Sequence, residues 1–401
     1  MLKSELYSLT YEILFITNTF PSRERRHRGL FNLRAVQALA KRHVVTVIHL
    51  RSWSPGRRTI EEAVLEGSIR LITISIPILP QVAPKFWAWQ LLIYKRLVFS
   101  ILKRVGVQYN IIHSVGMSFS GVVGSYISQK TGVKHVAQCI GSDVNITLPK
   151  IRYYYGVKGF ELFVNRFVCN SVMLKTNLEK IFPFVQADVV YRGVDLKEFP
   201  YQPSKKAEPI FTYFYLGGLS ERKSTGYGRN YKGGVTLLNA WKLVNGLCDK
   251  KALEIQLIFG GPDVSVEVIN SIFPKGNEIS NLQIVGELSS QEVAQHMAKA
   301  NVVIIPSHME GFPNVAFEAM ASGCSLIVSK VGGIPEIVKK NVNGIYVEPG
   351  NEEMLAQAIY QMALDPETYR RMGVVNRQTI EERYSLDRFV EVYSKIYSDA
   401  K

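Results

Sequence analysis

The sequence predicts an α/β protein made of two Rossmann-like domains that face each other across a cleft. The chain has 401 residues, and because domains typically span about 100–200 residues, two are expected. Apolar strand-like runs alternate with helical patterns, which is typical of parallel sheets covered by helices on both faces. The alternation restarts after a polar, proline-containing stretch at residues 194–208, which we interpret as the linker. The predicted domains are residues 1–200 and 201–380.

In the first half, short apolar runs bounded by turn residues predict buried strands. These runs lie at residues 13–17, 44–50, 69–76, 109–113, 133–139 and 167–172. A helix is predicted over residues 30–41, because apolar residues recur there every three or four positions.

The second half repeats this order. Strands are predicted at residues 210–216, 253–259, 282–285, 302–306, 325–329 and 344–347. Helical patterns fall between and after them, for example at residues 315–321 and 354–363. In such sheets, ligands bind beyond the carboxyl ends of the strands.

Composition excludes several classes of protein. Hydrophobic residues make up 47% and charged residues 20%, which is a globular composition and neither disordered nor collagen-like. The four cysteines form no C-x2-C pair, so neither a zinc ribbon nor a redox dithiol is expected, and their scarcity suits a reducing compartment. Glu5 and Glu12 stand where a secretory signal would be basic and then apolar. No uncharged apolar run reaches the length of a membrane span. We therefore expect a cytoplasmic protein.

Positive charge is concentrated in the first half of the chain. Residues 1–200 hold 27 Lys and Arg against 12 Asp and Glu, whereas residues 201–401 hold 21 against 22. Residues 21–58 contain ten basic residues and one acid. Such a basic half suggests an anionic partner, namely a membrane surface, an anionic substrate or nucleic acid. A solvated basic surface is the alternative, and no recognised nucleic-acid module supports a nucleic-acid partner.

Residues 85–104 mix Trp, Phe and Leu with Lys and Arg. A basic amphipathic helix with aromatic residues can lie in a membrane interface. The apolar arc of this helix extends most of the way round, which equally fits an ordinary buried helix. Both interpretations stay open.

The most informative motif is at residues 304–324. A strand leads into a tight loop, Glu310 to Pro313, and a helix follows from about Asn314. The free N–H groups and positive dipole at a helix N-terminus suit a phosphate. Glu310 in the loop and Glu318 in the helix can face the same mouth, where carboxylates accept hydrogen bonds from sugar hydroxyls. Taken alone, the pattern also fits a plain turn with two solvated glutamates.

The surrounding residues make the motif specific. Residues 306–323 read Pro-Ser-His-Met-Glu-Gly-Phe-Pro-Asn-Val-Ala-Phe-Glu-Ala-Met-Ala-Ser-Gly, followed by Val-Gly-Gly-Ile-Pro-Glu-Ile-Val from Val331. This segment, from Val302 to about Ile359, resembles the C-terminal signature of the family-4 retaining glycosyltransferases of the GT-B fold. Weaker phrases extend the resemblance over nearly the whole chain, including Gly141-Ser-Asp143 and Tyr231-Lys-Gly-Gly234. The resemblance also implies that a last helix, residues 381–401, crosses back to the first domain.

The resemblance implies roles for individual residues. Glu318 matches the glutamate on the donor ribose, Glu310 the one near the donor sugar, and Lys232 the lysine on the diphosphate. Gly29 would let the pyrophosphate approach the first domain. The donor-binding set is Gly29, Gly218, Arg229, Lys232, Gly311, Phe312, Pro313, Asn314 and Glu318. The catalytic set is Glu310, Lys232, Arg229 and Asp143. The acceptor or membrane side is assigned to Arg23, Arg25, Arg26, Arg28, His113 and Asp143.

The sequence departs from the family pattern in two places. The usual arginine before the lysine is missing from the phrase Gly217-Gly218-Leu219, so either Arg222 or Arg229 takes its place. We favour Arg229 because it lies near Lys232 in the sequence. Val115 replaces a second histidine that the family often has, so His113 is interpreted mainly as a structural residue at a strand end.

Together these observations predict a retaining transfer of sugar from a UDP- or GDP-sugar to a hydroxyl of a lipid-linked glycan in cell-surface polysaccharide synthesis. The protein would lie peripherally on the inner face of the cytoplasmic membrane. No cofactor or metal is expected, because cations already face the phosphates and no clear Asp-x-Asp motif is present. The alternatives are a soluble-acceptor transferase or disaccharide (phosphate) synthase of the same fold and, more distantly, a non-enzymatic nucleic-acid binder.

Overall fold

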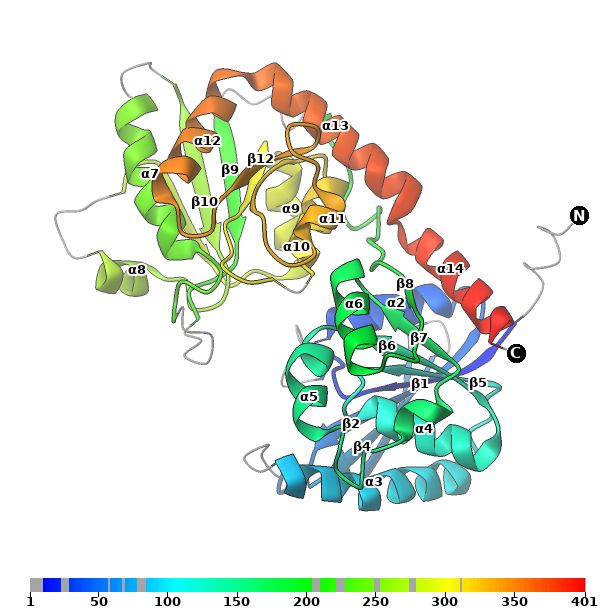
Figure 1. The fold of residues 1–401 in the computed structure, drawn as a ribbon. Coiled ribbons are helices and arrows are strands. Elements are labelled where there is room, and N and C mark those ends of the chain that lie inside the picture. The colour runs from blue at the N-terminus through cyan, green and yellow to red at the C-terminus, as the bar shows by residue number, and fades with distance from the viewer. Residues whose placement is uncertain are drawn as a thin grey trace, which may run out of the picture. The chain divides into compact units, whose positions relative to one another are not determined.

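In the computed structural model, the chain forms two compact units (Figure 1). Unit 1 comprises Met1–Gly193 and Leu386–Lys401, and unit 2 comprises Val194–Ser385. The first boundary therefore follows Gly193 rather than residue 200, and the chain returns to unit 1 at Leu386 rather than at residue 381. The structure describes residues 10–22, 29–56, 58–66, 69–77, 84–203, 210–220, 228–248, 253–273, 279–310 and 312–400.

Unit 1 contains an eight-stranded sheet of order β3-β4-β2-β1-β5-β6-β7-β8. Its strands are β1 (Glu12–Thr17), β2 (Val44–Ser52), β3 (Ile60–Leu65), β4 (Ile69–Ile76), β5 (Ile111–Val115), β6 (Lys134–Cys139), β7 (Arg166–Cys169) and β8 (Ala187–Val189). All neighbours pair in parallel except β3 with β4. The two edge strands, β3 and β8, were not predicted, because one is largely exposed and the other has only three residues.

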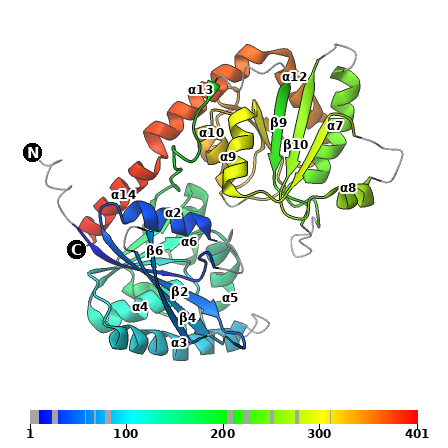
Figure 2. The same cartoon turned by 180° about the vertical axis from the view of Figure 1, so that it is seen from behind.

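Helices cover both faces of this sheet. They are α2 (Leu30–Leu39), α3 (Pro84–Val105), α4 (Ser120–Thr131), α5 (Leu148–Ile151), α6 (Val172–Ile181) and α14 (Leu386–Asp399), joined by the single turns η2 (Asp143–Thr147) and η3 (Phe160–Phe163). Figures 1 and 2 show α3 with α4 on one face and α2 with α14 on the other. In β1, Leu14 and Ile16 join the core under α3, whereas Ile13 and Phe15 join the core under α14. Burial on both faces explains why these strands are unbroken apolar runs.

One predicted strand, residues 167–172, was too long. β7 ends at Cys169, and Ser171 accepts a hydrogen bond from the backbone N–H of Leu174 as the N-cap of α6. Because serine is a preferred N-cap residue, the chain leaves the strand before Val172.

Unit 2 contains a six-stranded parallel sheet of order β11-β10-β9-β12-β13-β14. The strands are β9 (Phe211–Leu216), β10 (Ile255–Gly260), β11 (Leu282–Gly286), β12 (Val302–Ile305), β13 (Ser325–Ser329) and β14 (Gly344–Val347). The helices are α7 (Gly234–Cys248), α8 (Val266–Ile272), α9 (Ser290–Lys299), α10 (Asn314–Ala321), α11 (Ile334–Ile337), α12 (Glu352–Leu364) and α13 (Pro366–Arg383). The prediction of an α/β fold with two parallel-rich sheets is confirmed.

The strand order locates a switch point in the sheet of unit 2. From β9, the chain adds β10 and β11 on one side and then β12 to β14 on the other. In doubly wound sheets, a crevice opens where the order reverses, at the carboxyl ends of the strands. Such a crevice is expected between β9 and β12.

A helix must be both long and apolar to span a bilayer. Within the described parts of the chain, none meets both conditions.

Candidate donor site

A cavity of about 250 Å³ lies at this switch point in unit 2. Leu216 at the end of β9 and Ile305 at the end of β12 both line it. The full lining is Tyr215, Leu216, Gly217, Lys232, Ile304, Ile305, Ser307, Glu310, Phe312, Pro313, Asn314 and Val315. The structure thus brings together five predicted site residues: Lys232, Glu310, Phe312, Pro313 and Asn314.

The cavity contains an ion pair between Lys232 and Glu310. Lys232 Nζ lies 2.7 Å from Glu310 Oε1, and the same oxygen accepts a hydrogen bond of 2.8 Å from Ser307 Oγ. The Glu310 side chain is 8% exposed and that of Lys232 is 31% exposed. Two donors therefore fix the carboxylate in place, while the ammonium group keeps access to a ligand in the cavity.

Residues 230–233 form a turn, here called the Lys232 turn. Asn230 links this turn to the loop that contains Glu310. Its Oδ1 accepts hydrogen bonds from the backbone N–H groups of Val235 and Thr236, at the start of α7. Its Nδ2 donates to His308 Nε2 across 3.1 Å. Our sequence interpretation missed both Asn230 and Ser307. An asparagine just before a helical pattern is a capping signal that could have revealed Asn230.

Glycine is needed where this turn meets the end of β12. Gly233 has φ +74, and a Cβ there would lie 1.9 Å from the carbonyl oxygen of Pro306. Any other residue would combine a strained backbone with a backbone clash. The Lys232 turn is therefore packed tightly against the strand that leads to Glu310.

Tyr215 supports the cavity from β9. Its hydroxyl donates to the carbonyl of Gly218 across 3.1 Å. Burial, and then the charge of Glu310, raises the pKa of this hydroxyl, which stays protonated. Gly218, a predicted donor-binding residue, has φ +71, and a Cβ there would lie 2.4 Å from the carbonyl oxygen of Pro262. Gly217 rather than Gly218 lines the cavity.

The N-terminal turn of α10 closes the opposite side. Asn314 and Val315, its first two residues, both line the cavity, so the positive end of the helix dipole is close by. Phe312 is 8% exposed and packs on Phe317 with ring centroids 4.9 Å apart. Glu318 lies one turn further along α10, is partly buried, and is not among the lining residues.

Of the two candidate arginines, Arg229 alone lies within the described residues. Arg229 is exposed, next to Asn230, and does not line the cavity. Arg222 lies outside the described residues, as do Gly311 and the predicted membrane-side residues Arg23, Arg25, Arg26 and Arg28.

In unit 1, Gly29 lies at the carboxyl-end side of the sheet, after β1 and just before α2. It has φ +83, and a Cβ there would lie 2.7 Å from the carbonyl oxygen of Thr19. Asn32 fixes the same loop by donating to Thr17 Oγ1 and to the Thr19 carbonyl. The loop after β1 is therefore packed directly on the start of α2.

Asp143 is fully engaged with the backbone of unit 1. Its carboxylate accepts hydrogen bonds from the N–H groups of Met117, Ile140 and Gly141 at 2.8–3.2 Å. Burial raises the pKa of Asp143, and the N–H groups of Met117, Gly141 and Ile140 oppose that rise. The residue joins the loops that follow β5 and β6, so its evident work is to position them.

His113 is completely buried in β5. Its Nδ1 lies 2.7 Å from the hydroxyl of Tyr397, and its ring stacks on Tyr393 with centroids 4.9 Å apart. Burial lowers the pKa of His113 to about 3. Since Tyr393 and Tyr397 belong to α14, His113 attaches that helix to the sheet of unit 1.

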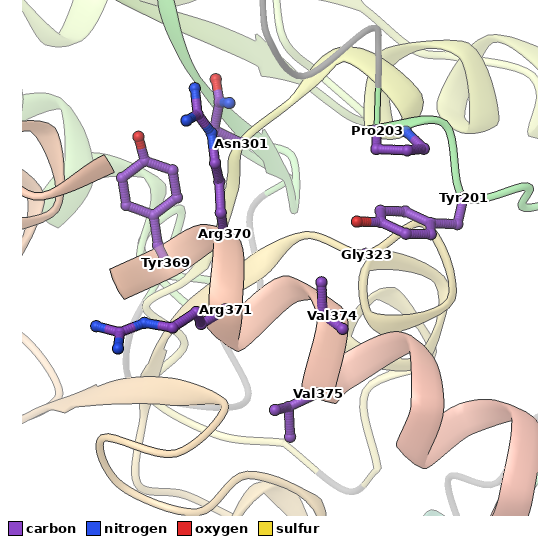
Figure 3. A pocket seen from close by; sticks show the side chains of 9 residues that line it. All are labelled: Tyr201, Pro203, Asn301, Gly323, Tyr369, Arg370, Arg371, Val374 and Val375. Atoms are coloured by element: carbon purple, nitrogen blue, oxygen red, sulfur yellow. The ribbon is translucent and has the colours of Figure 1, made fainter. Parts of the chain in front are cut away.

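A second, larger cavity of about 480 Å³ lies at the amino ends of the strands in the unit 2 sheet. Asn301, which immediately precedes β12, and Gly323, two residues before β13, both line it. Figure 3 shows Tyr201 and Pro203 on one side, and Tyr369 and Arg370 on the other. Because β12 spans about 13 Å, this cavity is separate from the Lys232–Glu310 pair.

Over the ranges that the structure describes, no group of three or more His, Cys, Asp or Glu residues is arranged to hold a metal ion.

Two parallel-rich α/β units, with a cavity at the switch point of the second, define a protein of the GT-B fold. A model described as Glycosyltransferase Family 4 matches residues 31–198, and one described as Glycosyl transferases group 1 matches residues 225–379. The chain belongs to this family of glycosyltransferases.

Curated relatives agree with this assignment. An uncharacterized glycosyltransferase of Methanocaldococcus jannaschii is 26% identical over 300 residues, which cover 75% of this chain and 78% of the relative. A D-inositol 3-phosphate glycosyltransferase of Saccharomonospora viridis is 32% identical over 152 residues, which cover 36% of this chain and 35% of the relative.

Solved structures share the fold. Sucrose-phosphate synthase from Thermosynechococcus elongatus superposes with a TM-score of 0.70 at 20% identity, covering 97% of this chain and 98% of the other. Anabaena HepE in complex with UDP gives a TM-score of 0.69 at 16% identity, covering 98% and 100%. At these identities the likeness concerns the fold alone.

Proposed function

We propose that the protein is a retaining, metal-independent glycosyltransferase that moves a sugar from a UDP- or GDP-sugar to a hydroxyl of a lipid-linked glycan. The observation that carries this proposal is the Lys232–Glu310 pair beside the first turn of α10, in a cavity at the switch point. Structures of Anabaena HepE with UDP and with UDP-glucose are among the similar folds, which favours a uridine diphosphate donor.

The cavity suits a diphosphate leaving group. Lys232, with Arg229 as the second cation, would take up negative charge as the bond between sugar and phosphate breaks, and the first-turn N–H groups of α10 would add to it. Glu310 lies within 2.7 Å of the lysine ammonium, so it would orient that group and face the donor sugar. Glu318 would accept hydrogen bonds from the ribose hydroxyls.

Retention follows from attack on the face that the leaving group vacates, with a phosphate oxygen taking the acceptor proton. The proposal assigns no protein base to this step. Asp143 is the nearest candidate by resemblance, yet both of its oxygens accept backbone N–H groups, so we propose a positioning role for it. His113 is likewise proposed to be structural, since its ring is fully buried.

The lipid-linked acceptor and the inner membrane face are supported by the charge of the first half of the chain. That half carries 27 basic and 12 acidic residues, whereas the second half is nearly neutral. A diphosphate-linked acceptor and an anionic bilayer are both negatively charged, so both would be attracted to a basic surface. Synthesis of a surface polysaccharide is the pathway class that uses such acceptors.

A soluble acceptor is the second candidate. It is favoured by one observation, namely that similar proteins include D-inositol 3-phosphate glycosyltransferase and sucrose-phosphate synthase, whose names give phosphorylated soluble compounds. A sugar phosphate or inositol phosphate would also meet the basic half of the chain.

The test is nucleotide release from UDP-, GDP- and ADP-sugars, measured alone, with a bacterial lipid extract, and with soluble sugar phosphates. We expect one donor to be used and its release to rise with the lipid extract. Glu318→Ala should abolish most of that release, while Glu353→Ala, a change at an exposed glutamate of α12, should not. Stimulation by a sugar phosphate only would replace the lipid acceptor, and normal turnover by Glu318→Ala would refute the ribose assignment.

A further inference from the structure

The longest helix of unit 1 exposes an apolar stripe. Along α3, four large side chains are exposed: Phe86 by 48%, Trp89 by 54%, Ile93 by 46% and Leu97 by 39%. Their spacing of three or four residues places them on one side of the helix. Monomeric proteins rarely leave such a continuous apolar surface to water, so the stripe marks an interaction site.

Basic residues continue the same face. Arg96, Lys103 and Arg104 are exposed and fall with the apolar stripe within an arc of about 120° at 100° per residue. No Asp or Glu occurs in the 22 residues of α3. The exposed face of α3 therefore carries large apolar side chains from Phe86 to Leu97 and basic side chains from Arg96 to Arg104.

An aromatic turn extends this surface. Tyr153 is 72% exposed and Tyr155 is 87% exposed. Gly156 fixes their position, because a Cβ there would lie 1.9 Å from the carbonyl oxygen of Ala88 in α3. The turn thus packs directly on the helix near Trp89. Its surroundings are also basic, since residues 150–160 include Lys150, Arg152 and Lys158 and no acid.

We infer that this surface, the exposed face of α3 with Tyr153 and Tyr155, docks on an anionic lipid bilayer. Tryptophan and tyrosine favour the boundary between lipid headgroups and acyl chains, and helices with one aromatic face and flanking Lys and Arg lie in that boundary. The helix is about 33 Å long, and Figures 1 and 2 show it running along the outside of unit 1. It presents its stripe lengthwise, as an interfacial helix does.

The charge distribution favours lipid over a protein partner. A protein docking site normally has a mixed polar rim around its aromatic centre. Here every charged residue of α3 is cationic, which complements a surface of one sign. The inference rests on the proposed function in one respect only: the bilayer would carry the acceptor.

The first test is sedimentation with vesicles of phosphatidylcholine alone and of phosphatidylcholine mixed with phosphatidylglycerol. We expect binding to the anionic vesicles, weakened by salt. The triple change Arg96→Gln, Lys103→Gln and Arg104→Gln should weaken it about 100-fold, from roughly fivefold for each cation. The triple change Phe86→Ser, Trp89→Ser and Ile93→Ser should weaken it at least tenfold.

A matched control comes from unit 2. Leu243 and Leu247 on α7 are exposed by 48% and 39%, much like the stripe residues. Their change to serine should leave vesicle binding unaltered. If both triple variants bind vesicles like the unmodified protein, the inference is overturned, and absence of any vesicle binding would assign the stripe to a protein partner instead.

Tryptophan fluorescence locates the contact directly. Lipids brominated in the acyl chain quench tryptophans that enter the bilayer, and Trp89 is the exposed tryptophan on the stripe. Quenching should disappear in Trp89→Phe and persist in Trp53→Phe, where Trp53 is 43% exposed but lies outside α3. Quenching retained in Trp89→Phe would contradict the assignment.

Failure of this inference and failure of the proposed function give different results. Vesicle binding needs no donor, so a protein that docks through α3 but releases no nucleotide would keep the inference and lose the function. Nucleotide release without vesicle binding would support the proposed function and overturn the inference about α3. Far-UV circular dichroism and thermal unfolding like those of the unmodified protein show that unit 1, which contains α3, is still folded in these variants.

Discussion

The two units use polar residues of their strands and connecting loops in opposite ways. In unit 1, Asp143 and His113 are buried, and their polar atoms are occupied in joining loops and holding α14. In unit 2, Asn230 does the joining, and Lys232 keeps 31% of its side chain exposed beside a cavity. The difference agrees with the proposed function, in which an anionic ligand meets Lys232 in unit 2, whereas Asp143 and His113 hold the structure of unit 1 together.

The largest expected effect is on catalysis in unit 2. Lys232→Ala should lower kcat about 10²–10³-fold, because it removes a cation from the developing charge of the leaving group. Lys232→Arg should retain part of the activity. Steady-state nucleotide release measures this, and Lys242→Ala, a lysine that lies over the ring of Phe273, is the control. A kcat for Lys232→Ala near that of the control would break the contrast between the units.

The second effect is a greater acid sensitivity of unit 1. Burial lowers the pKa of both His113 and His135 to about 3, from the ordinary histidine value of 6.5. Between these pH values the unfolded chain binds protons that the folded chain does not. The free energy of unfolding is therefore intact above about pH 6.5 and falls as the pH drops, by about 1.4 kcal/mol per pH unit for each histidine.

Hydrogen exchange measured from pH 7 to pH 5 follows each unit separately. We expect amides of β5 and β6 to lose protection before those of β9 and β12. His113→Gln, which retains a polar group for Tyr397, should make the pH dependence of unit 1 shallower. Equal loss of protection in both units would show that the buried histidines do not set the acid stability of unit 1.

Much of this contrast could be predicted from the sequence, but not all of it. Fully buried strands such as β1 and β12 are continuous apolar runs, so the sheets were predictable. The Glu310 loop was found because its residues are consecutive. The link from Asn230 to His308 joins residues 78 apart in sequence, and the burial of Asp143 depends on N–H groups from two loops, so neither follows from local pattern. Likewise, the exposed stripe of α3 could not be distinguished from a buried helix, because the rest of α3 is also apolar.

A smaller effect is expected at Arg229. Arg229 is the proposed second cation on the diphosphate, so Arg229→Ala should lower kcat/KM about tenfold. The loss should be smaller than that caused by Lys232→Ala, because Arg229 is exposed and does not line the cavity. Competition by UDP or GDP measures whether the loss is in nucleotide binding. If Arg229→Ala is silent and Arg222→Ala is not, the second cation lies at Arg222.

The smallest effect should come from Asn230→Ala. Its Oδ1 accepts from two N–H groups at the start of α7, and loss of such a cap costs about 1 kcal/mol in the free energy of unfolding. Its Nδ2 also donates to His308, so the Lys232 turn should loosen and kcat should fall several-fold. Asn230→Asp keeps the cap but loses the donor to His308. Denaturant titration and kcat together should therefore show near-normal stability with reduced turnover for Asn230→Asp, and both losses for Asn230→Ala. If Asn230→Asp turns over like the unmodified protein, the link to His308 does not position Lys232. If its stability falls as far as that of Asn230→Ala, the Oδ1 contacts do not hold the start of α7.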